Sequence, residues 1–152
     1  MMYYQVYDFT RKDDDMADAF NPPGVAIPFG AFSNAAWQPP GRVLHLAGQV
    51  GVDEDWKLVG PGDMVAQARQ ILTNLKAILH HVDGEMDDIV SVIVYVTKME
   101  PLMAVHEVRK EFFSEPYPAS TLVQVAALVK PEFLIEISAV AVIPGVRADA
   151  RA

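Results

Sequence analysis

The sequence predicts an α+β domain in which two helices cover one face of a mixed β-sheet. Apolar residues recur with strand and helix periods in the order β-β-α-β-α-β-β along the chain. The 152 residues provide material for one hydrophobic core of ordinary size. Two helices can cover only one face of such a sheet, so the other face needs cover from elsewhere. We expect another subunit to provide it.

The first two predicted strands lie near residues 32–37 and across the segment RVLHLAGQVGV, residues 42–52. The second strand alternates, with Val43, His45, Ala47 and Gln49 on one face and Leu44, Leu46, Gly48 and Val50 on the other. A Pro-Pro-Gly turn at residues 39–41 separates the two strands. We therefore expect them to form a hairpin.

Two segments have the apolar spacing of amphipathic helices. The first spans residues 63–82, with Asp63 as the N-cap and Gly84 as the left-handed residue after the helix. The second spans residues 101–114, because Pro101 suits a first helical turn and apolar residues follow at helical spacing. Both helices should bury their apolar stripes against the sheet.

Three further strands complete the predicted sheet. The segment DIVSVIVYVTKM is almost continuously β-branched from residue 89 to 96, which is typical of a strand buried on both faces. The other two strands are predicted at residues 120–128 and 133–143. Flanking segments divide the chain into an N-terminal extension (1–20), a folded domain (21–145) and a C-terminal tail (146–152).

Composition argues against several classes of partner. Twelve basic residues against twenty acidic residues give a formal charge of −8, which repels a nucleic-acid backbone. There is no cysteine, so disulfides and thiolate metal sites are excluded. No segment has the roughly 20 apolar residues that span a bilayer, and no signal-like region precedes the domain. We expect a cytoplasmic protein without membrane contact.

Familiar catalytic and cofactor motifs are missing. The nucleophile elbow, the phosphate-binding loop and the dinucleotide fingerprint do not occur. The histidines at positions 45, 80, 81 and 106 lack metal-ligand spacing, and we expect solvated or helix-capping side chains there. We predict neither a metal nor a cofactor.

One acidic residue stands out in the last strand. Glu136 lies in the apolar run FLIEISAVAV, so its carboxylate must be paired, line a cleft or face solvent. The sequence leaves a cleft acid and an edge-strand surface acid equally open. Alternation predicts that Ile135 and Ile137 face the core while Glu136 and Ser138 share the other face.

Several segments together resemble the Rid/YjgF family, also called the endoribonuclease L-PSP family. They are NPPGVAIPFGAFSNA, LHLAGQVGVD, AQARQILTNLKAIL, DDIVSVIVYVTKM, VRKEFF and YPASTLVQVAALVKPEFLIEISAVAV. The resemblance implies a chorismate-mutase-like homotrimer with one small-molecule cleft at each subunit interface. It also implies hydrolysis of reactive imines and enamines to ketoacids and ammonia.

The chain departs from the family pattern where the substrate would bind. The family's PAR[ST] motif, whose arginine can grip a carboxylate, reads Pro-Ala-Ser-Thr here, with Ser120 at the arginine position. Phe32 and Ala47 replace a tyrosine and a serine, whereas Glu136, Gly48 and Gln49 are retained. Ordinary iminoacids such as 2-aminoacrylate should therefore bind poorly, and the cleft should suit a less anionic ligand.

The resemblance assigns seven site residues. Glu136 and Thr121 are the candidate catalytic residues, and Phe32, Ala47, Gly48, Ser120 and Gln124 are the candidate substrate-binding residues. A non-catalytic trimeric metabolite-binding protein is a second hypothesis. The old family label also suggests a ribonuclease or translation inhibitor, which the formal charge of −8 disfavours.

Overall fold

The computed structural model describes residues 18–144. The strands are β1 (Asp18–Phe20), β2 (Ala35–Trp37), β3 (Arg42–Val50), β4 (Ile89–Val96), β5 (Ala119–Gln124) and β6 (Ile135–Ile143). The helices are α1 (Met64–His81), the 3-10 turn η1 (Met86–Asp88) and α2 (Leu102–Phe112). The predicted order is confirmed, with β1 added at the start of the described region.

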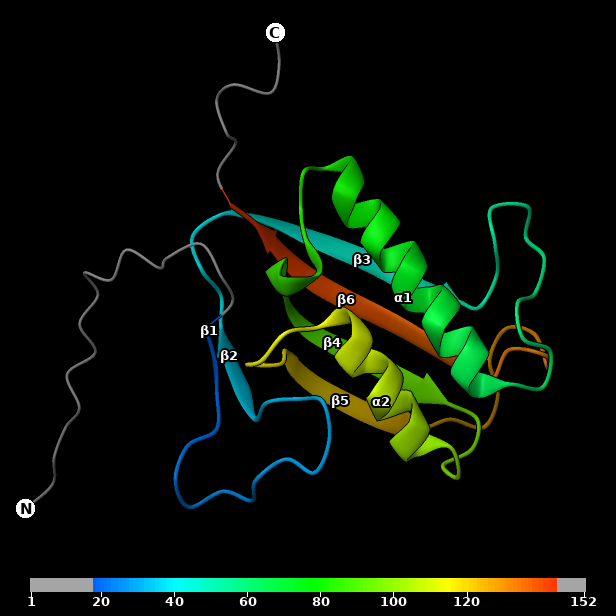
Figure 1. Cartoon of the computed structure of the whole chain (residues 1–152), viewed down its shortest axis with the longest axis horizontal. Helices are drawn as coiled ribbons and strands as arrows, with labels where there is room; N and C mark the ends of the chain where they lie inside the picture. Colours follow the sequence, from blue (N-terminus) through cyan, green and yellow to red (C-terminus); the bar gives the residue numbers. More distant parts are fainter. Residues whose placement is uncertain (1–17, 145–152) are drawn as a thin grey trace, which may run out of the picture.

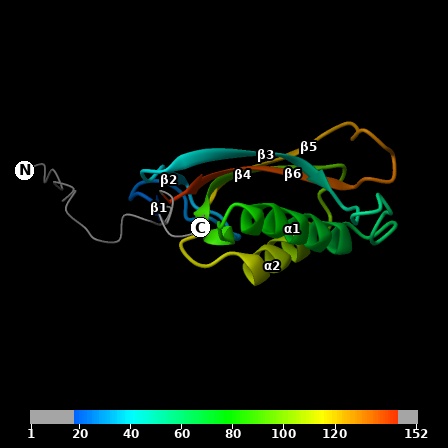
Figure 2. The same ribbon diagram turned by 90° about the horizontal axis from the view of Figure 1, so that it is seen from above.

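The main sheet has the strand order β3-β6-β4-β5. Strands β4 and β5 run parallel, whereas β6 pairs antiparallel with both β3 and β4. Both helices lie on one side of this sheet, as Figure 2 shows edge-on. The predicted α+β fold, a mixed sheet with two helices on one face, is confirmed. Neither helix of the described region is long and apolar enough to cross a membrane.

Helix α1 begins as its sequence predicts. The Asp63 carboxylate accepts hydrogen bonds from the backbone N–H groups of Val65 and Ala66, at 2.9 and 3.0 Å. Its apolar stripe is buried against the sheet, as for Leu72 and Leu75. At the other end the prediction for Gly84 is wrong, because Asp83 is the residue with positive φ. Gly84 instead donates its N–H to the Leu79 carbonyl at 2.9 Å.

Strand β4 is buried on only one face within the single chain. Val92, Val94 and Val96 lie in the core beneath the helices. Ile93 points the other way and is 40% exposed. The cover that the sequence predicts for the second face is thus absent within one chain's described residues.

The uncovered side of the sheet, which we call the open face, carries apolar side chains on several strands. Val43 on β3, Ile93 on β4 and Val123 on β5 are 43%, 40% and 40% exposed. Figure 2 shows that no described helix lies on this side. Exposed apolar side chains on three strands of one sheet face are typical of a surface that another subunit covers.

The predicted hairpin between the first two strands is wrong. Strand β2 pairs antiparallel with β1, and β3 pairs with β6 along almost its whole length. Pro39 and Pro40 cannot donate backbone hydrogen bonds to a ladder, and the chain leaves β2 directly through them. Ser33 then forms an isolated bridge with Ala119, which places the segment before β2 against the start of β5 (Figure 1).

Two strand limits also differ from the prediction. Strand β5 ends at Gln124 rather than 128, and β6 begins at Ile135 rather than 133. Phe133 is buried in a turn, where it packs with Val50 and Val52 in a small separate cluster. Its apolar character therefore serves loop packing and not the ladder.

Candidate functional site

A pocket of about 290 Å³ lies beside the edge strand β5. Its walls come from the segment before β2, from the start of α2 and from β5. The lining residues are Phe29, Phe32, Met99, Leu102, His106, Ser120 and Leu122. The volume is at the small end of ligand sites, and the mostly apolar walls with few polar groups are typical of such sites.

Three rings form one wall of this pocket. Phe29 meets His106 edge-on with centroids 5.7 Å apart, and Phe32 lies stacked on His106 at 6.0 Å. Phe29 and Phe32 also meet edge-on at 5.6 Å. A side-chain carbon on Gly30 would lie only 2.6 Å from the His106 ring, so the close approach requires glycine. The Phe32 ring and the loop backbone at Gly30 therefore confine the His106 ring, whereas Phe29 is 67% exposed.

His106 is the polar centre of the ring wall. It is 2% exposed, and its Nδ1 accepts the backbone N–H of Ala31 at 3.2 Å. Burial lowers the pKa of His106, and the positive charges of Arg109 and Lys110 lower it further, against a smaller opposing effect of Glu107. The expectation of a solvated or capping histidine is wrong here, because α2 turns this residue toward the loop and away from solvent.

Ser120 contributes to the pocket wall from β5. It pairs with Val92 of β4 and so faces the helix side of the sheet. Its hydroxyl is closed off from solvent and has no hydrogen-bond partner among the described residues. A ligand could reach this hydroxyl only after neighbouring side chains move. Because serine is short, the pocket keeps the space that a longer side chain at position 120 would fill.

Arg109 follows His106 by three residues on the buried side of α2. Only 1% of it is exposed, and both terminal guanidinium nitrogens lack a partner among the described residues. Burial lowers the pKa of Arg109 to about 10. The group is thus an uncompensated cation within the fold, whose charge acts on His106.

Glu136 lies on the open face, away from the pocket. Its neighbours Ile135 and Ile137 are buried in the core while Glu136 and Ser138 are only partly buried, which confirms the predicted alternation. The carboxylate packs directly over Gly48, whose missing side chain leaves the space. Two predicted site residues are therefore in contact.

An irregularity in β3 brings Gly48 to this face. Leu46 pairs with Ala139 and Gln49 pairs with Ile137, so two residues of β3, Ala47 and Gly48, lie opposite one residue of β6. Beyond the bulge, each residue of β3 faces the side of the sheet opposite to the one that simple alternation predicts. The prediction that Gly48 shares a face with Leu46 is therefore wrong, because simple alternation assumes an unbroken ladder.

The remaining predicted residues are dispersed within one chain. Thr121 pairs with Ile93 on the open face, but β4 separates its strand from that of Glu136, a lateral distance of roughly 10 Å. Ser120 faces the other side of the sheet. Gln124 lies at the end of β5 and donates to the Thr97 carbonyl at 3.3 Å. Neither hydroxyl therefore reaches Glu136 in the same chain.

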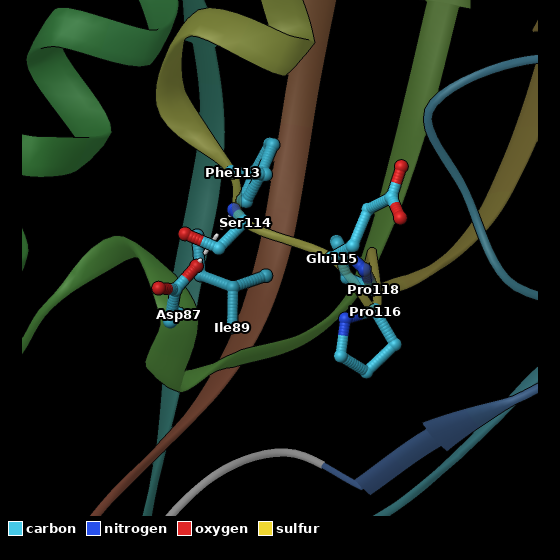
Figure 3. Close-up of a pocket in the computed structure, with 7 residues that line it drawn as sticks. All are labelled: Asp87, Ile89, Phe113, Ser114, Glu115, Pro116 and Pro118. Carbon is cyan, nitrogen blue, oxygen red and sulfur yellow. Dashed lines mark hydrogen bonds between the residues drawn. The ribbon is translucent and has the colours of Figure 1, made fainter.

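A second, much smaller cavity lies between η1 and the turn before β5. Its volume is about 10 Å³, and it is lined by Asp87, Ile89, Phe113, Ser114, Glu115, Pro116 and Pro118 (Figure 3). The Asp87 carboxylate accepts the backbone N–H of Ser114 at 3.0 Å across it. This space holds about one water molecule, so it serves turn packing and not ligand binding.

The pattern in α2 could have identified His106 and Arg109 in advance. Both belong to the helical stripe that includes Val105 and Phe112, which is where a polar residue must be buried or line a cavity. Phe29 could not be found this way, since it lies in an irregular segment. Within residues 18–144, no three His, Asp or Glu side chains gather as a metal site would require.

Comparison with known proteins identifies the family of this chain. The model of the family described as endoribonuclease L-PSP matches residues 24–143. A RutC family protein of Pyrococcus horikoshii is 38% identical over 114 residues, which cover 75% of this chain and 88% of the relative. A 2-iminobutanoate/2-iminopropanoate deaminase of Dermatophagoides farinae is 33% identical over 116 residues, covering 76% and 88% of the two chains.

Solved structures show the same fold. A Rid-family protein of unknown function from Yersinia pestis superimposes with a TM-score of 0.78 at 36% identity, covering 84% of this chain and 98% of the other. The RidA protein of an Antarctic Psychrobacter gives a TM-score of 0.63 at 33% identity, with coverages of 86% and 95%. The chain therefore belongs to the endoribonuclease L-PSP family, which is the Rid/YjgF family.

Proposed function

We propose that this Rid-family protein binds a small, weakly charged imine- or enamine-type metabolite in the pocket beside β5, at a junction between subunits. The observation that carries the proposal is the pocket itself. It is the size of a small metabolite, it is walled by aromatic and aliphatic side chains, and Ser120 lines it at the family's arginine position. A carboxylate would lose its hydration there without gaining a cation in the wall.

The relative named 2-iminobutanoate/2-iminopropanoate deaminase supports the substrate class. The substrates in its name carry a carboxylate beside the imine. Ser120, Phe32 and Ala47 remove charged and hydroxyl groups from the corresponding positions here. The proposed ligand keeps the imine, enamine or related amide group and lacks the carboxylate.

A second subunit is part of the proposal. Glu136 and His106 lie on opposite sides of the same sheet, so no single chain can direct both at one ligand. The pocket opens at the edge strand β5, where a neighbouring open face can approach. The proposed homotrimer would cover the apolar open face and present the Glu136 of one subunit to the pocket of the next.

Hydrolysis is the reaction that such a junction can perform. Glu136 would accept a proton from a water molecule as that water adds to the imine carbon. Glu136 would pass this proton to the imine nitrogen, which gives a carbinolamine. The hydroxyl proton of the carbinolamine then moves to the nitrogen as the carbon–nitrogen bond breaks, so that ammonia leaves and a carbonyl forms. Imine hydrolysis has a low intrinsic barrier, so positioning and one acid–base group are sufficient.

The test is ammonia release from a panel of neutral and anionic small imines. Glu136→Gln should lower the rate on the preferred imine by about a hundredfold or more if the carboxylate is the base. Glu54→Gln, a change on an exposed loop residue, is the matched control and should leave the rate unchanged. Ligand binding without ammonia release would favour the non-catalytic binding protein. The absence of both binding and turnover for every imine of the panel would contradict the proposal.

A further inference from the structure

We infer that His106 is the fixed hydrogen-bond donor of the pocket, and that it selects an uncharged, planar ligand bearing a carbonyl or imine acceptor. This inference rests on the proposed function because it names the ligand class of the same pocket. It adds His106 to the seven site residues that the resemblance assigned and gives it a defined role.

The hydrogen bond to the loop determines which nitrogen carries the proton. Nδ1 of His106 accepts the N–H of Ala31 at 3.2 Å, so in the neutral ring the proton resides on Nε2. Among the described residues no group accepts a hydrogen bond from Nε2. The polar side-chain atoms closed off from solvent without a partner belong to Arg109 and Ser120, and Nε2 is not one of them. Nε2–H is therefore a donor available to the pocket that His106 lines.

The donor also has a fixed direction. The His106 ring is 2% exposed and contacts Phe29 and Phe32, with centroids 5.7 and 6.0 Å away. Gly30 allows the loop backbone to approach the ring. A donor that is already oriented loses little entropy when a ligand binds, so it discriminates well between ligands with and without an acceptor.

The surrounding charges keep His106 uncharged. Arg109 and Lys110 on the same helix disfavour a second cation, and burial does so more strongly, while Glu107 opposes them weakly. A protonated ring would also lose the acceptor that holds the N–H of Ala31. The pocket lining contains no cation that could compensate a bound carboxylate. The neutral His106 donor therefore favours a neutral acceptor.

Arg109 does not change this selection. Its terminal nitrogens are closed off from solvent, so they cannot hydrogen-bond a molecule in the pocket as the fold stands. The aromatic wall adds a preference of its own, because flat sp² groups pack well against ring faces and edges. The pocket chemistry thus favours a primary amide, a lactam or an uncharged imine.

Nitrogen-15 NMR of the histidine side chains tests the first half of the inference without any ligand. At pH 7 the His106 signals should show a neutral ring with the proton on Nε2. Assignment is made with His106→Gln, and His81→Gln, which removes an exposed imidazole, provides the matched comparison. A proton on Nδ1, or a charged ring at pH 7, would overturn the inference whatever the function of the pocket.

Binding of a matched pair of probes tests the second half. Pyruvamide and pyruvate have the same size, but only pyruvate is charged. Pyruvamide should bind at least about tenfold more tightly than pyruvate, and His106→Phe should weaken pyruvamide binding by roughly fivefold. His106→Gln, which keeps an N–H donor, should recover part of that loss. Circular dichroism and thermal unfolding of each variant establish that it is folded.

The outcomes separate the inference from the proposed function. Tighter binding of pyruvate would overturn the inference and leave a Rid-type ligand site in place. An equal loss of pyruvamide affinity in His106→Phe and His106→Gln would overturn the donor role, because ring packing alone would then explain the effect. If the parent protein releases ammonia from imines and His106→Phe does so at the same rate, the result would support the proposed function and refute this inference.

Discussion

The carboxylate of Glu136 lies directly over the α-carbon of Gly48, in the space where any other residue would place its β-carbon. The contact depends on the bulge in β3, which turns Gly48 to the open face. Gly48 thus determines where the acid can lie on the face that we propose as a subunit interface.

Gly48→Ala should displace the Glu136 carboxylate with little cost to the fold. The overlapping atom is the end of a flexible side chain, so we expect a loss in unfolding free energy of less than about 1 kcal/mol. Gly41→Ala is the contrasting variant, because a β-carbon there would meet the backbone carbonyl of Ile143. It should cost about 2 kcal/mol or more in urea unfolding. Equal losses in the two variants would contradict this description of Gly48.

Arg109→Met should stabilise the protein at neutral pH. The buried guanidinium has a pKa lowered to about 10 by burial, and two of its nitrogens lack partners within the described residues. Methionine fills a similar volume without a charge, so the unfolding free energy should rise by on the order of 2 kcal/mol. Urea unfolding measures this change. A fall in stability would show that the guanidinium has a partner in the assembled protein.

The stability of the fold should decrease as the pH falls below about 6.5, the ordinary pKa of histidine. Burial lowers the pKa of His106 in the folded chain, so between that lowered pKa and 6.5 the unfolded state binds more protons. Stability therefore increases with pH through this window and levels off above it. Urea unfolding at a series of pH values measures the slope.

The variant His106→Phe should reduce this slope, whatever its effect on stability at neutral pH. His81→Gln, which removes an exposed imidazole, is the matched comparison. An unchanged slope in His106→Phe would assign the pH dependence to other groups. The expectation of a buried neutral ring would then be wrong.

The protein should release ammonia from 2-aminoacrylate only slowly, since Ser120 provides no cation for the carboxylate. Ser120→Arg alone should restore little activity, because a productive grip also needs supporting contacts around the guanidinium. A continuous ammonia assay compares the two proteins with an arginine-bearing family member. A parent rate close to that of such a member would show that another residue supplies the charge.

The elements whose apolar residues recur with strong periodicity could be predicted from the sequence. Helix α1 begins at its predicted cap because Asp63 precedes an uninterrupted apolar stripe. Strong periodicity also predicted the existence of strands β4 and β6, and Ile135 and Ile137 are buried as expected, although β6 begins at Ile135 rather than at residue 133 and one face of β4 is exposed. Local pattern and tertiary packing agree in these segments.

The site was less predictable because it depends on contacts between distant segments. The bulge at Gly48 arises from the pairing of β3 with β6, and the pairing of β2 with β1 replaced the expected hairpin. His106 acquires its environment from a loop about 75 residues away in sequence, through the N–H of Ala31. No local pattern encodes such a contact.

Mixed oligomers test most directly whether the site is built from two subunits. His106→Phe and Glu136→Ala should each weaken pyruvamide binding when present in every subunit. In oligomers reassembled from equal amounts of the two variants, roughly a quarter of the sites should combine an intact His106 with an intact Glu136 of the neighbour and bind pyruvamide as the parent does. If both residues served one site within a single chain, mixing would restore no binding, and that result would contradict the account.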